Sequence, residues 1–128
     1  MLKETLIQIF ERDLTKLIGE INLYKDENDL WIKQGSITNS AGNLALHLSS
    51  NLNHFIGFGI GNTGYIRNRE AEFNTQSVPR EELLIQLERT IDVVKNAIAN
   101  LSVEDFEKPF PIEKQGEIFS INYMLLHL

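Results

Sequence analysis

Apolar residues recur at alternating steps of three and four in two long segments, as one face of an α-helix requires. In the first segment they fall at Leu2, Leu6, Ile9, Phe10, Leu14, Leu17, Ile21 and Tyr24. In the other they fall at Leu84, Leu87, Ile91, Val94, Ile98 and Leu101, behind a helix-start signal at 77–82. A further helix is predicted from Ser40, which can cap its N-terminus, to Gly61. The last helix is predicted from a Ser120 cap over 121–128.

The segments between these helices are rich in turn formers, so 25–39 and 62–77 are predicted to be loops. The capping signature at 102–105 is followed by Pro109 and Pro111, which predicts a short helical turn and an extended connection. Tyr24 and Trp31 are expected to seal one end of the core, with a pocket wall as the alternative. Glycines at Gly57, Gly59 and Gly61 are interpreted as packing residues, because no strand precedes them as in a phosphate-binding loop.

The chain of 128 residues fits one domain, 1–128, and its 42% hydrophobic and 23% charged residues are typical of a globular protein. Three long helices and the start of a fourth predict an all-α fold, an up-down four-helix bundle whose fourth helix is cut short at the C-terminus. No apolar stretch reaches the roughly 20 residues that span a bilayer, so we expect no membrane partner and a cytoplasmic location.

Charge and cysteine content narrow the chemistry. The net charge of −6 makes nucleic acid a poor partner. The chain has no cysteine, so any metal ion would have to be bound by histidine and oxygen ligands. No nucleophile elbow, P-loop or dinucleotide-binding fingerprint is found in a strand-turn-helix context.

Polar residues form one stripe on the helix predicted from Ser40. Its members are Asn43, His47, Ser50 and His54. The stripe is either the solvated side of an amphipathic helix, or the floor of an interhelical pocket with His47 as a metal ligand or general base. His47 and His54 do not share an ion, since seven residues of helix separate them by about 10.5 Å along the axis.

Two arginines in the predicted loop 62–77 can also be interpreted in two ways. Arg67 and Arg69 either bind an anionic group of a small-molecule substrate through their planar guanidinium groups, or are solvated surface charges.

The stretch SAGNLALHLSSNLNHFIGFGIGNTGYIRNREAEF, residues 40–73, resembles the DinB-like (YfiT-like) family of bacterial four-helix-bundle proteins, and the whole chain follows the layout of that family. The resemblance implies that His47 and His127 are metal ligands. It places a third histidine three positions beyond Leu128. The implied cofactor is a divalent metal ion, Zn, Ni or Mn, and the implied activity is that of a metal-dependent enzyme of the thiol-dependent transferase or hydrolase type.

A second hypothesis is a non-enzymatic helical bundle that acts as a dimerisation or binding module. The short last helix is expected to leave part of an apolar face uncovered, so that either the chain is truncated or a homodimer formed through that face buries it. The two hypotheses are compatible, because the family that the chain resembles commonly dimerises.

Overall fold

The computed structural model describes residues 2–33, 40–75, 77–112, 117 and 119–127. The described residues are mostly helical and contain no strand, which confirms the all-α class. The long helices are α1 (Leu2–Asn22), α2 (Ala41–Leu52) and α4 (Arg80–Ala99). The short elements are the 3₁₀-helices η1 (Glu27–Trp31) and η3 (Glu104–Glu107), the π-helix η2 (Asn53–Phe58), and the helices α3 (Arg69–Asn74) and α5 (Ile121–His127).

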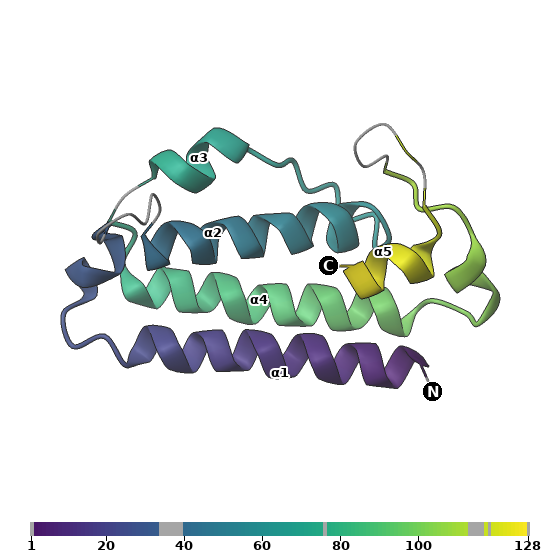
Figure 1. The fold of residues 1–128 in the computed structure, drawn as a ribbon, viewed down its shortest axis with the longest axis horizontal. Coiled ribbons are helices and arrows are strands. Elements are labelled where there is room, and N and C mark those ends of the chain that lie inside the picture. Colours follow the sequence, from purple (N-terminus) through teal and green to yellow (C-terminus); the bar gives the residue numbers. More distant parts are fainter. Residues whose placement is uncertain (1, 34–39, 76, 113–116, 118, 128) are drawn as a thin grey trace.

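The three long helices lie side by side, and α4 packs against both α1 and α2 (Figure 1). Helix α1 runs opposite to the other two, whereas α2 and α4 run in the same direction. Helix order is therefore not the predicted simple up-down alternation. Parallel neighbours need a crossover that returns the chain to its starting end, and its described residues, 59–75 and 77–79, lie above α2.

Apolar side chains fill two clusters along the long helices. The larger contains Leu6, Phe10, Leu14, Leu52, Ile56, Val94, Ala97, Ile98, Leu101, Phe106, Phe110, Ile121, Met124 and Leu125. The smaller contains Ile21, Leu30, Ala45, Leu83 and Leu87. Tyr24 and Trp31 pack against the smaller cluster, as predicted for the end of the core.

Side-chain caps hold the helix ends where the sequence predicts them. The Ser40 hydroxyl accepts a hydrogen bond from the Asn43 amide at the start of α2. Ser102 and Asp105 form a reciprocal capping pair, and the Ser120 hydroxyl accepts from the Tyr123 amide. These bonds satisfy amide groups that have no partner within the helix.

Helix α2 continues into the π-helix η2, and glycines let its end approach other residues closely. A Cβ atom on Gly57 would lie 2.9 Å from Val93 Cγ1 on α4, and one on Gly61 would lie 3.2 Å from Ala97 Cβ. At Gly59 it would lie 2.3 Å from the Phe55 carbonyl oxygen. The interpretation of these glycines as packing residues is confirmed.

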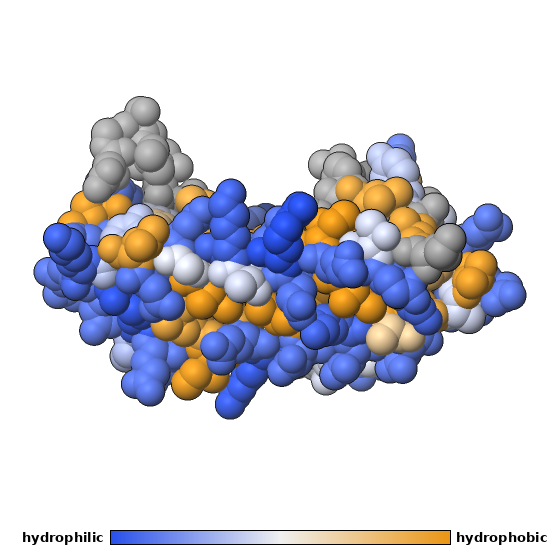
Figure 2. Space-filling view, turned by 90° about the horizontal axis from the view of Figure 1, so that it is seen from below, coloured by the Kyte–Doolittle hydropathy of each residue, from blue (hydrophilic) through white to orange (hydrophobic). Residues whose placement is uncertain are grey.

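Helix α5 covers part of the face between α1 and α2. A groove of about 190 Å³ remains there, lined by Leu6, Ile9, Phe10, Asp13, Leu14, Leu48, Leu52, Leu125 and Leu126. From below, apolar patches are visible between polar side chains, mainly in the middle of the molecule (Figure 2). Among the described helices, none has the length and apolar character that crossing a membrane requires.

Two glycine substitutions test this packing in opposite directions. Gly59→Ala should lower the free energy of unfolding by about 1–3 kcal/mol, because its methyl group overlaps backbone. Gly19→Ala, in α1 with nothing within 4 Å of the added Cβ, should raise it by about 0.5–1 kcal/mol. Urea unfolding measures both. A Gly59→Ala variant as stable as the parent protein would contradict the close approach.

Candidate functional site

The polar stripe of α2 lies under the crossover, which pairs with it residue by residue. Asn43 donates from its amide to the carbonyl oxygens of Glu72, at 3.1 Å, and Thr75, at 2.6 Å. Farther along α2, the Tyr65 hydroxyl donates to Ser50 Oγ at 2.8 Å. Asn43 is 2% exposed and Ser50 6% exposed, whereas the His47 side chain is 33% exposed. The stripe is therefore covered by the crossover at Asn43 and Ser50 and partly open at His47, whose role as a ligand or base stays a prediction.

The Glu72 carboxylate is the centre of the site and is only 4% exposed. Arg67 donates to both of its oxygens, from Nε to Oε2 at 2.8 Å and from Nη2 to Oε1 at 3.0 Å. His47 Nδ1 lies 2.8 Å from Oε1. A buried carboxylate with this two-point guanidinium partner is held in one orientation, because both bonds are charge-assisted.

Opposing effects act on the Glu72 pKa. Burial raises it, because the charged form loses hydration. Hydrogen bonds from Arg67, Ser50 and His47 outweigh burial and lower the pKa from 4.5 to about 2. Glu72 is therefore ionised throughout the neutral range.

The charge on Glu72 decides which nitrogen of His47 carries a proton. An ionised carboxylate only accepts hydrogen bonds, so the 2.8 Å contact requires a proton on His47 Nδ1. Arg67 Nη2, which lies 3.4 Å from the same nitrogen, also carries protons and does not compete for it. In the neutral imidazole the acceptor lone pair then resides on Nε2.

A short helix, α3, places Glu72 in the site, and sequence reasoning missed it by assigning 62–77 to a loop. The Asn68 side chain accepts from the Ala71 amide, and Glu70 and Glu72 occupy the first turn. An N-cap asparagine followed by acidic residues is a recognised helix-start signal, so the sequence contained a usable clue. The role of Glu72 was missed for the same reason, because a loop gives no reason to face it toward α2.

The two predicted substrate-binding arginines have different environments. The Arg67 side chain is 7% exposed and is engaged by Glu72, whereas Arg69 is exposed. The structure therefore does not bring the two arginines together as one anion-binding pair.

The other two histidines also differ. His54 lies in η2, where its ring stacks on Phe58 with ring centroids 6.1 Å apart. Burial lowers its pKa, and the positive charge of Arg67 adds to that effect. His127 ends α5, and its side chain lies outside the described part of the structure.

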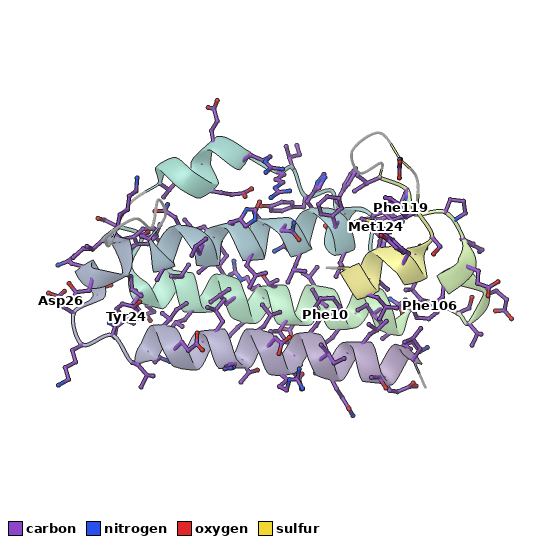
Figure 3. All side chains as sticks on the ribbon, in the orientation of Figure 1. Phe10, Tyr24, Asp26, Phe106, Phe119 and Met124 are labelled. Atoms are coloured by element: carbon purple, nitrogen blue, oxygen red, sulfur yellow. The ribbon has the colours of Figure 1, made fainter. Side chains whose placement is uncertain are left out.

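A cleft of about 590 Å³ adjoins Glu72 between α2, the crossover and α4. Its lining residues are Leu46, Ser50, Tyr65, Ile66, Asn68, Ala71, Glu72, Thr75, Val78, Glu82, Ile85, Gln86 and Arg89. Stick side chains reach into the space between α3 and α2 from both elements (Figure 3). The volume lies in the range of about 300–1,000 Å³ that is usual for small-molecule sites.

The described residues supply part of a metal site. His47 is oriented through Nδ1 by a carboxylate, an arrangement that metal-binding histidines commonly share. Among the described residues, however, no group of three or more His, Cys, Asp or Glu side chains is placed to hold a metal ion. The imidazole of His47 is a suitable donor for a divalent ion. The described residues do not supply a full set of ligands for it.

Comparison with known proteins adds no assignment: no protein-family model, curated protein or solved structure matches the chain.

Replacement of Glu72 tests the buried ion pair. Glu72→Gln should lower the free energy of unfolding at pH 7 by about 3 kcal/mol, because it leaves Arg67 buried without its counter-ion. The folded pKa of about 2 lies below the ordinary 4.5, so the contribution is complete above pH 4.5 and is lost as pH falls toward 2. The variant should therefore lose less stability than the parent over that interval in urea unfolding.

The matched control is Glu70→Gln, an exposed position on the same helix. It should change stability by less than about 0.5 kcal/mol and keep the acid dependence of the parent. If the free energy of unfolding fell equally in the Glu72→Gln variant and in the parent between pH 4.5 and 2, the assigned role of Glu72 would be contradicted.

Proposed function

We propose that this chain is a divalent-metal-binding protein of the DinB-like type, with His47 as a ligand whose orientation Glu72 fixes. The observation that carries the proposal is the 2.8 Å contact between His47 Nδ1 and Glu72 Oε1, held by the two bonds from Arg67. A carboxylate on the second ring nitrogen makes an imidazole a better and more rigid ligand. The ion of the proposal is Zn, Ni or Mn.

Helix α5 is proposed to take the fourth position of a four-helix bundle, which would bring His127 to the same ion. Leu125 and Leu126 line the groove together with Leu48 and Leu52 of α2. The ends of α5 and α2 therefore face one groove between them. The pairing of His47 with His127 is carried by the family resemblance.

The proposed activity is that of an enzyme of the thiol-dependent transferase or hydrolase type acting on a small molecule. A bound divalent ion would lower the pKa of a coordinated water or thiol. The protein's own contribution is to fix the ring of His47, to keep Glu72 ionised through Arg67, and to offer a cleft beside Glu72. The competing hypothesis of a dimerisation module stays a prediction, and the groove between α1, α2 and α5 is the surface it would use.

Metal content tests the proposal with a matched pair of histidine variants. After exposure to Zn, Ni or Mn and removal of excess, the parent protein should retain close to one ion per chain by inductively coupled plasma mass spectrometry. His47→Ala should abolish retention. His54→Ala, on the same stripe but stacked on Phe58, should leave it unchanged.

The supporting carboxylate provides a second readout. Glu72→Gln should weaken metal affinity by about 10–100-fold, because the imidazole loses its fixed orientation. Circular dichroism would show that each variant is folded. A parent protein that takes up none of the three metals, or a His47→Ala variant that retains them, would refute the proposal.

A further inference from the structure

The cleft beside Glu72 has features that the metal proposal does not use. It is bounded on one side by the crossover and on the other by α4, and Glu72 and Ser50 form part of its wall. The polar groups of that wall are already engaged: Tyr65 donates to Ser50, and the Glu72 carboxylate accepts from Arg67. Recognition of a ligand must therefore come from the remaining lining residues.

Apolar side chains face the cleft from both sides. Ile66, in the crossover, is 89% exposed, although its neighbours Tyr65 and Arg67 are anchored to α2 and α3. Ile85, on α4, is 42% exposed. Both line the cleft, so an apolar group placed there would remove both isoleucines from water. The ligand is therefore expected to have an apolar body.

Arg89 gives the cleft a positive end. It is exposed on α4, and no ion pair of Arg89 is found within the described residues. The other arginine nearby, Arg67, is neutralised by Glu72. Gln86 lies one helical turn before Arg89 and also lines the cleft, so its amide can donate beside the guanidinium.

The cleft lining has a second acidic residue besides Glu72, namely Glu82 on α4. Glu82 is in the first turn of α4, where a negative charge is stabilised by the helix dipole. Seven residues separate it from Arg89, which is about 10.5 Å along the helix axis and about one Debye length at ordinary salt. Glu82 is therefore placed where the helix dipole stabilises it, and at this distance solvent and salt largely screen its charge from an anion bound at Arg89.

We propose that this cleft binds a small amphiphilic carboxylate, with the apolar body between Ile66 and Ile85 and the carboxylate on Arg89 and Gln86. The proposal does not depend on a metal ion. Its test is therefore made in the presence of a chelator, and failure of either proposal leaves the other standing.

Octanoate and octan-1-ol are the probes, since they share an apolar chain and differ in charge. By titration calorimetry, octanoate should bind with a Kd of about 1 mM or tighter. Arg89→Gln should weaken octanoate binding about fivefold and leave octan-1-ol binding unchanged. Arg12→Gln, an exposed arginine on α1, is the matched control and should change neither.

Apolar variants distinguish this cleft from the groove between α1, α2 and α5. Ile66→Ser should weaken both probes by about the same factor, whereas Ile9→Ser, in the groove, should affect neither. Three results would overturn the proposal. They are no octanoate binding at millimolar concentration, equal effects of Arg89→Gln on both probes, or a loss of binding with Ile9→Ser in place of Ile66→Ser.

Discussion

The buried carboxylate of Glu72 is the constraint on which the attachment of the crossover to α2 depends. Its charge is out of water and would be costly without the guanidinium of Arg67 on both oxygens. Once that pair is formed, the carboxylate has a fixed position from which it accepts a hydrogen bond from His47 Nδ1–H. The ion pair lies within the crossover, and its contact with His47 joins the crossover to α2 and sets the tautomer of that histidine.

The topology explains why such a pair is needed. Because α2 and α4 run in the same direction, the chain must return along α2 before α4 begins. The returning segment is attached to α2 through polar contacts, from Ser50 with Tyr65 to Asn43 with Thr75. Asn43 and Ser50, which would be solvated on a free helix, are therefore buried here, and the cleft lies between the attached segment and α4.

The sequence predicted the long helices well because packing against a core leaves a periodic apolar pattern, as in Leu87, Val94 and Ile98 of α4. The sequence also predicted the helix caps at Ser40 and Ser120, because a cap is a local interaction. It did not predict the direction of α4 relative to α2, since periodicity carries no information on which end of a bundle a loop reaches. Glu72 was missed because its role depends on partners 5 and 25 residues away in sequence.

The tautomer of His47 is the most direct test of this account. Two-bond ¹H–¹⁵N correlation spectra of the imidazole groups, assigned with His47→Ala and recorded at about pH 9 where histidine is ordinarily neutral, report which ring nitrogen carries the proton. The account predicts a proton on Nδ1 of His47 in the parent protein and averaging between the two tautomers in Glu72→Gln. A proton on Nε2 in the parent protein, or the same averaged signal in both, would contradict it.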